Sequence, residues 1–302
     1  MANNIELIEK FIPLLDRKYQ VESKSAILDL DMTLARPTMD ARSILLPRML
    51  LQGLGDYDRN GGYTLGDMTL TWESHTFSQD RGRMIPIDTM DDLETAFLLY
   101  VNVAGEFIRH HVSPELDAYR FSRYAALKTT PTDNTAVTAA NVLSLVIAGR
   151  TALVNNHVPL TDIIIFATPQ VYGNLMLSSD IQKNATVTVS TPWGIQLEIP
   201  SINSMPIIEV PADRMMTEYL FLDATTAGQE QGGFEPTATA KQINFMMISR
   251  SAPMQIVKRA QPKIIDPDNN ILADGWRFGY RIYHDAFVPF NKTNGIYANI
   301  EA

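Results

Sequence analysis

The feature that most constrains the fold is a long helical segment between Thr89 and Leu127. Thr89 can cap its N-terminus, and the acidic residues Asp91, Asp92 and Glu94 follow in the first turn, where negative charge stabilises the helix dipole. Apolar residues then recur at helical spacing, at Leu93, Phe97, Tyr100, Val101, Ala104, Phe107, Ile108 and Val112. A helix of about 22 residues spans about 33 Å, long enough to support a whole domain.

A second helix is predicted directly after the first. Arg109, His110 and His111 suit the negative end of the first helix dipole. Ser113 can then cap a new helix, and Pro114 fits its first position. The two helices together form the predicted spine of the fold.

A long two-stranded ribbon is predicted just before this spine, within residues 42–88. Residues 68–77 alternate Met68, Leu70 and Trp72 with threonines and Glu73, which is typical of a strand. Residues 83–87 provide its predicted partner strand, and residues 53–62 form a glycine-rich loop. A lone two-stranded ribbon is marginally stable in water, so we expect another subunit to cover it.

The rest of the chain mixes helices and strands, so we predict the α+β class. Residues 136–156 have helical periodicity, residues 162–167 form a short apolar strand buried on both sides, and a helix follows Pro169. Further strands are predicted at 185–189, 195–199, 206–210, 218–222, 243–249, 254–258, 276–284 and 295–300. Residues 129–236 therefore resemble a separate lobe, and residues 228–239 are predicted to form a loop.

Composition excludes several classes of protein. The chain has no cysteine, which excludes disulfides and thiolate metal sites and fits a reducing cytoplasm. Its formal net charge of −9 argues against a dedicated nucleic-acid-binding protein. The N-terminus does not resemble a signal peptide, and no apolar run approaches the about 18 residues of a membrane span.

No catalytic or cofactor-binding pattern emerges. His110-His111 lacks a third metal ligand at helical spacing, and His284-Asp285 is predicted to lie at a half-exposed strand end. The acidic cluster at 91–94 could hold Mg²⁺, although capping explains it better, and residues 266–270 suit a plain turn. We therefore expect no enzymatic activity, no cofactor and no metal.

Charged side chains instead suggest contacts between subunits. Arg81 and Arg83 are predicted at the tip of the second ribbon strand, where they could pair with acidic residues of a neighbour, such as 56–58 or 91–94. Lys258, Arg259 and Lys263 form a second basic group, although a solvated surface explains any single charge better. The candidate subunit-interface residues are Tyr57, Arg59, Trp72, Arg81, Arg83, Asp91, Asp92 and Glu94.

Four segments resemble the major capsid protein of tailed double-stranded-DNA bacteriophages, whose fold encapsulins share. The first two are DRGRMIPIDTMDDLETAF and VAGEFIRHHVSPELDAYRFSRYA, which resemble the family's entry into its spine helix and the helix itself. The segment INSMPIIEVPADRM resembles a strand and turn of its middle lobe. The segment from Lys263 to Ile300 resembles its C-terminal strands.

The resemblance implies a shell subunit with four parts. These are an N-terminal arm (1–41), an extended loop (42–88), a peripheral domain with the spine helix (89–128 and 237–286) and an axial domain (129–236 and 287–302). It further implies pentamers and hexamers that form an icosahedral head around DNA, without sequence-specific binding to it. Scaffolding and portal proteins are the expected further partners. Assembly is expected in the host cytoplasm, and no membrane is involved.

Two alternatives remain open at this stage. An encapsulin-like compartment would share the fold and enclose cargo protein instead of DNA. A soluble enzyme without a recognisable motif would need titratable residues that converge in a cleft, and the sequence shows no such set.

Overall fold

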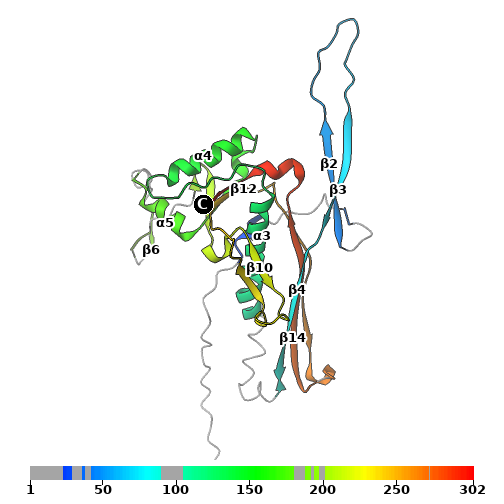
Figure 1. Ribbon diagram of the computed structural model, residues 1–302, viewed down its shortest axis with the longest axis vertical. Helices are drawn as coiled ribbons and strands as arrows, with labels where there is room; N and C mark the ends of the chain where they lie inside the picture. The colour runs from blue at the N-terminus through cyan, green and yellow to red at the C-terminus, as the bar shows by residue number, and fades with distance from the viewer. Residues whose placement is uncertain are drawn as a thin grey trace, which may run out of the picture.

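The computed structural model has the mixed helix and sheet architecture drawn in Figure 1. It describes residues 23–28, 42–89, 105–179, 201–271 and 273–302 in full, and the backbone of strands at 36–37, 188–191 and 194–196. Most of the predicted N-terminal arm and the acidic helix start at 91–94 therefore lie outside the described residues.

A five-stranded sheet forms the centre of the fold, in the order β15–β12–β5–β9–β8. Its strands are β5 (Ile163–Ala167), β8 (Ser201–Ile202), β9 (Met205–Glu209), β12 (Ile243–Ser249) and β15 (Ile296–Ile300). β5 pairs in parallel with β9 and antiparallel with β12. Every residue of β5 is buried, which confirms the prediction of a strand covered on both sides.

Helices cover both faces of this sheet. They are α3 (Ser113–Leu127), α4 (Val142–Asn155) and α5 (Pro169–Leu177). Because side chains of a strand alternate between its two faces, Phe166 of β5 packs against Phe121 of α3, with ring centroids 5.1 Å apart. Ile163 and Ile165 instead belong to the core that α4 and α5 form on the opposite face. The sheet therefore has an apolar core on each face, one beneath α3 and the other beneath α4 and α5.

The spine does not break at Ser113. Residues 105–107 are helical, and a π-helical turn, η2 (Ile108–Val112), leads directly into α3. Ser113 has helical backbone angles and its hydroxyl donates to the carbonyl of Ile108, so the prediction that it caps a new helix is wrong. Pro114 explains the widened turn, because proline has no N–H to donate to the preceding turn and its ring crowds that turn. Arg109 and its neighbours therefore lie within a continuous helix.

A long three-stranded sheet lies beside the spine, in the order β13–β14–β4. Its strands are β4 (Gln79–Asp88), β13 (Met254–Ile265) and β14 (Gly275–Phe287). β4 contains the predicted partner of the ribbon strand at 68–77, but it pairs with β14 along its whole length. The predicted ribbon pairing is therefore wrong, because a strand at 43–51, which was not predicted, pairs with β3 instead.

Three smaller sheets complete the strands. The first contains β1 (Arg36–Pro37), β2 (Ser43–Leu51) and β3 (Met68–Thr76); the others are β6 (Thr188–Thr191) with β7 (Gly194–Gln196), and β10 (Tyr219–Leu222) with β11 (Gly233–Pro236). β11 lies inside the segment predicted as a loop. The 3-10 helices are Ser25–Leu28, Leu160–Asp162, Ala212–Arg214, Pro267–Asn269 and Phe290–Gly295. In Figure 1 the β2–β3 hairpin extends from the body in one direction, and the far end of β13–β14–β4 extends in the other.

Gly149 of α4 marks a close approach of a helix to the central sheet. A Cβ atom there would lie 2.7 Å from the ring of Tyr297 and 2.9 Å from Met247 Sδ. We expect Gly149→Ala to lower the free energy of unfolding by about 1–3 kcal/mol, because overpacking forces these neighbours apart. Gly173→Ala in α5 is the matched control, since a Cβ atom at that position would meet nothing within 4 Å, and it should stabilise the chain in the same denaturation assay. Equal effects of both substitutions would contradict this packing argument.

Candidate interaction surface

An apolar cluster anchors the base of the β2–β3 hairpin to the body. It contains Ile44 and Leu46 of β2, Phe77 after β3, Ile256 of β13 and Phe287 of β14, all buried. The ring of Phe77 lies 5.5 Å from that of Phe287, edge to face. Only the base of the hairpin therefore contributes to the core, and the rest extends beyond it.

The strand register separates the two faces of the hairpin by chemistry. Residues directly opposite each other in the ladder share a face. One face carries the pairs Pro47–Trp72, Met49–Leu70 and Leu51–Met68, which are all apolar, whereas the other carries Leu46–Glu73, Arg48–Thr71 and Leu50–Thr69. Alternation with a period of two therefore gives the hairpin one continuous apolar face, defined here as those first six residues.

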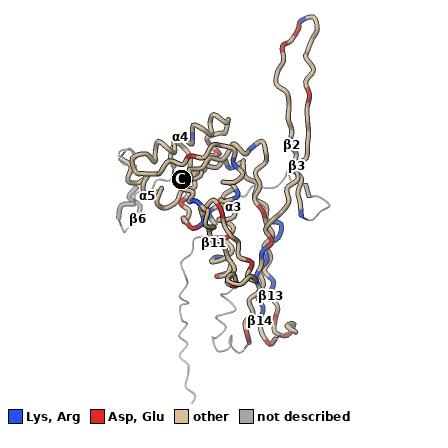
Figure 2. Tube along the Cα trace, viewed as in Figure 1, with Lys and Arg blue, Asp and Glu red and all other residues tan. Residues whose placement is uncertain are grey.

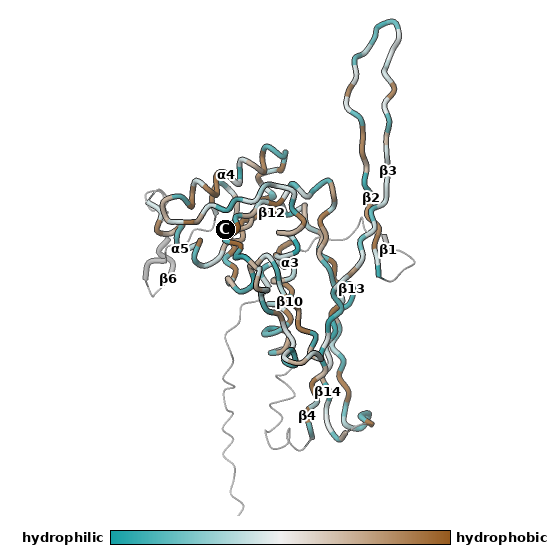
Figure 3. The backbone as a smooth tube through the Cα atoms, viewed as in Figure 1, coloured by the Kyte–Doolittle hydropathy of each residue, from teal (hydrophilic) through white to brown (hydrophobic). Residues whose placement is uncertain are grey.

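This apolar face is open to solvent. The exposed fraction is 51% for Met49, 53% for Leu70 and 65% for Met68. Figure 2 shows few charges on the strands of the hairpin, and Figure 3 shows apolar segments along it. Contiguous exposed apolar surface is typical of interaction sites, so this face is the candidate contact surface of the chain.

The tip of the hairpin also exposes apolar side chains, among charged ones. Leu54 and Leu65 are fully exposed, and the rings of Tyr57 and Tyr63 pack edge to face at 4.9 Å. A bridge between Asp58 and Gly62 closes the turn, with Gly62 at a φ of 84° that glycine adopts without strain. The tip therefore has its own local structure without any contribution from the core.

The predicted interface residues fall into three groups. Tyr57, Arg59 and Trp72 lie on the projecting hairpin, and all three are exposed. Arg81 and Arg83 lie in β4 on the body, so their predicted position at a ribbon tip is wrong. Asp91, Asp92 and Glu94 lie outside the described residues. The sequence pattern did indicate Met68, Leu70 and Trp72, but it missed Met49 and Leu51, whose strand was not recognised.

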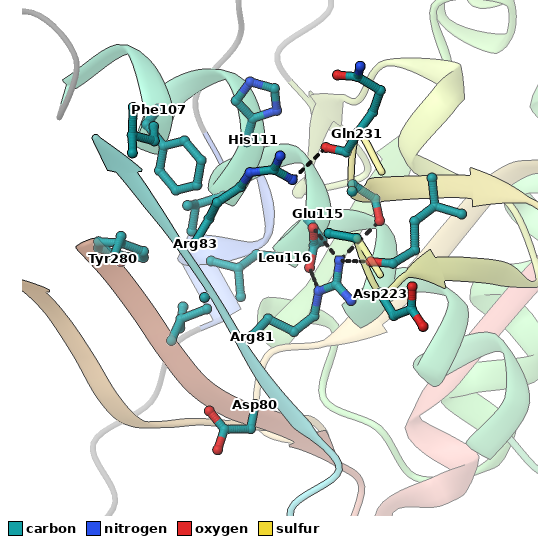
Figure 4. A pocket seen from close by; sticks show the side chains of 18 of the residues that line it. Asp80, Arg81, Arg83, Phe107, His111, Glu115, Leu116, Asp223, Gln231 and Tyr280 are labelled. Atoms are coloured by element: carbon teal, nitrogen blue, oxygen red, sulfur yellow. Dashed lines mark hydrogen bonds and ion pairs between the residues drawn. The ribbon is translucent and has the colours of Figure 1, made fainter. Parts of the chain in front are cut away.

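Arg81 connects three parts of the body. Its guanidinium forms an ion pair with Glu115 of α3 and donates to the carbonyls of Leu222 (3.0 Å) and Gly233 (3.1 Å) in the β10–β11 hairpin. Arg83 donates to the carbonyl of Gln231 at 2.9 Å. Figure 4 shows both arginines pointing across a cavity of about 590 Å³ towards these groups. Burial raises the pKa of Glu115, and the nearby Arg81 opposes that shift.

The titratable candidates do not converge on a catalytic arrangement. His284 and Asp285 are buried in β14, so the prediction of a half-exposed strand end is wrong. His110 contacts Glu106 at 2.6 Å within one helix. Among the described residues no group of three or more histidine or acidic side chains could hold a metal ion. The described part of the chain has no helix long and apolar enough to cross a membrane.

Comparison with solved structures identifies the fold of the chain. No protein-family model matches the sequence, and no curated protein matches it significantly. Solved structures do match: the mature capsid of bacteriophage PhiM1 has a TM-score of 0.67 at 12% identity, with 98% of this chain and 92% of that chain covered. The capsid of cyanophage P-SCSP1u gives 0.63 at 12% identity, with 100% and 92% covered. A chain of Mycobacterium phage Che8 gives 0.58 at 12% identity, with 97% and 98% covered. The chain therefore has the bacteriophage major capsid fold that its sequence motifs predict.

Proposed function

We propose that this chain is the structural major capsid protein of a tailed bacteriophage, and that its copies assemble into pentamers and hexamers of an icosahedral head. The observation that carries the proposal is the apolar face of the hairpin, which is exposed to solvent in the described chain. A capsid fold explains it, because each copy can cover the hairpin of the next. The partner is thus a second copy of the chain, and the protein is located in the virion.

The division into parts remains a proposal with one refinement. The arm (1–41), the peripheral domain (89–128 and 237–286) and the axial domain (129–236 and 287–302) stay as predicted. Because β4 pairs with β14 and not with β3, we assign residues 79–88 to the peripheral domain and end the extended loop at Ser78. The loop is then the β2–β3 hairpin with the residues that join it to the body.

Further partners follow from the same proposal. Scaffolding and portal proteins would guide assembly, and packaged DNA would contact the inner face without sequence-specific binding. The net charge of −9 supports weak contact with DNA, since a strongly basic inner wall would hold the genome. Contact between copies, and not catalysis, is the role that the described surface supports.

Two neighbouring residues on opposite faces of β3 provide a sharp test. Leu70 lies on the apolar face, and Thr71 lies on the opposite face, with both side chains exposed. We expect Leu70→Glu to reduce the yield of shells at least tenfold, because it places a charge in the proposed contact between copies. Thr71→Glu is the matched control and should assemble nearly as well as the parental chain. Sedimentation velocity and negative-stain microscopy would measure the yield.

The outcomes separate the candidate functions. Normal assembly of Leu70→Glu would show that the apolar face is not a contact between copies. A parental chain that stays monomeric at high concentration, with scaffolding protein supplied, would overturn the capsid proposal. Shells recovered from the host with a protein cargo and no DNA would favour an encapsulin-like compartment.

A further inference from the structure

The chain passes from the hairpin to the body through a very short joint. β3 ends at Thr76 in the hairpin sheet, and β4 begins at Gln79 in the long sheet of the body. Only Phe77 and Ser78 lie between them. The backbone angles of two residues therefore influence the direction in which the whole hairpin leaves the body.

Phe77 fixes one side of the joint by packing. Its side chain is buried, and its ring lies 5.2 Å from that of Tyr283 in β14. Its N–H also donates to the carbonyl of Arg42 at 2.8 Å, which joins the end of β3 to the residue before β2. Apolar packing has no preferred direction, so it does not by itself set the orientation of the joint.

Ser78 fixes the other side through one buried carboxylate. The Ser78 N–H and hydroxyl both donate to Asp285 Oδ2, at 2.7 and 2.9 Å. The Tyr119 hydroxyl of α3 donates to Asp285 Oδ1 at 2.6 Å, and the Ala286 N–H donates to the same oxygen at 2.7 Å. Asp285 is only 1% exposed. The carboxylate therefore connects the joint, the spine helix and β14 with directional bonds.

Hydrogen bonds to a carboxylate are about twice as strong as neutral ones, and four of them converge on Asp285 from three segments of the chain, so this arrangement holds the joint in one orientation. We propose that Asp285, with Ser78 and Tyr119, is a positioning site that sets the angle of the hairpin relative to the body. This inference rests on the proposed function, because the angle matters when the hairpin covers a neighbouring copy. A fixed angle between copies gives shells of uniform curvature, whereas a loose joint allows several.

The absence of cysteine makes the angle measurable. Cysteines introduced as Thr71→Cys in β3 and Leu177→Cys in α5, both at exposed positions, would be the only two sites for thiol-directed spin labels. Pulsed electron paramagnetic resonance on the unassembled chain then gives the distribution of distances between the label on the hairpin and the label on the body. We expect Ser78→Ala to broaden this distribution at least twofold, because it removes one of the two bonds from Ser78 to Asp285 and its contact with Tyr119.

Ser74→Ala is the matched control, since it makes the same change at an exposed position of β3 close to the joint, and it should leave the width unaltered. Tyr119→Phe is a second variant that loses the bond to Asp285 and keeps the aromatic ring. In unlabelled chains, Ser78→Ala and Tyr119→Phe should give shells whose diameters spread at least twice as widely as those of the parental chain. Unchanged distances and diameters in both variants would overturn the inference. A parental chain that forms no shell would overturn the proposed function, and the distance distributions would still decide whether this site positions the hairpin.

Discussion

Replacing Asp117 by alanine is expected to lower the free energy of unfolding by about 3–5 kcal/mol, the cost of breaking a buried ion pair. Asp117 lies in α3 with an exposed fraction of 0%, and Arg214 Nη1 donates to its Oδ2 at 2.9 Å. Without the carboxylate, Arg214 keeps its buried charge and loses the anion that it faces. Urea denaturation of the unassembled chain would measure the change.

The same carboxylate also holds the N-terminal segment against the spine. It accepts bonds from the hydroxyl groups of Ser23 and Ser25 and from the backbone N–H groups of Lys24 and Ser25, at distances between 2.6 and 3.1 Å. We therefore expect trypsin to cleave after Lys24 faster in Asp117→Ala than in the parental chain.

Two controls make the Asp117 result specific. Asp268→Ala removes an exposed carboxylate between β13 and β14, and it should change stability by no more than about 0.5 kcal/mol. The double variant Asp117→Ala, Arg214→Ala should lose less than the sum of the two single losses, because the two side chains interact directly. Additive losses and unchanged cleavage after Lys24 would contradict the role assigned to Asp117.

The contacts of Asp117 show where sequence reasoning ends. The helix that contains it was predicted from apolar periodicity, and the segment PELDAY suggested the fold family. The partners of Asp117 come from positions 92 to 97 residues away, and a single sequence gives no measure of such distances. The pattern of apolar residues along a segment predicts a helix or strand. Only the packed fold shows which polar groups of distant segments are buried together.

The strand errors have a similar cause. Alternation correctly predicted the strand at 68–77, but its partner was predicted at 83–87, because the strand at 43–51 was not recognised. The sequence at 79–88 does not specify which strand it pairs with. In the folded chain it pairs with β14, as the edge of the long sheet beside the spine. Arg81, which was predicted at the tip of an interface ribbon, therefore lies in the body and forms an ion pair with Glu115. The apolar hairpin face follows from sequence only in part, since half of it lies on the missed strand.

Acidification is expected to destabilise the fold through His284. Burial lowers the pKa of this histidine to about 4, the Arg120 and Arg81 guanidinium groups add to the effect, and Asp285 opposes it. The folded chain therefore keeps His284 neutral between pH 6.5 and about 4, whereas the unfolded chain binds a proton there. The stability contribution is complete above pH 6.5 and is lost as pH falls towards 4. A pKa shift of this size corresponds to about 3 kcal/mol of the free energy of unfolding.

His284→Phe isolates this effect, because phenylalanine cannot titrate and can keep the edge-to-face contact with Tyr119, whose ring lies 5.4 Å away. The parental chain should lose about 3 kcal/mol more than this variant between about pH 7 and about pH 4. Glu115 titrates in part of the same range with the opposite sign, since its raised pKa makes the folded chain bind the extra proton. Subtracting the two stability curves removes that contribution from both chains. His157→Asn, at an exposed position after α4, should retain the parental pH dependence. If His284→Phe also retains it, another buried group must cause the acid sensitivity.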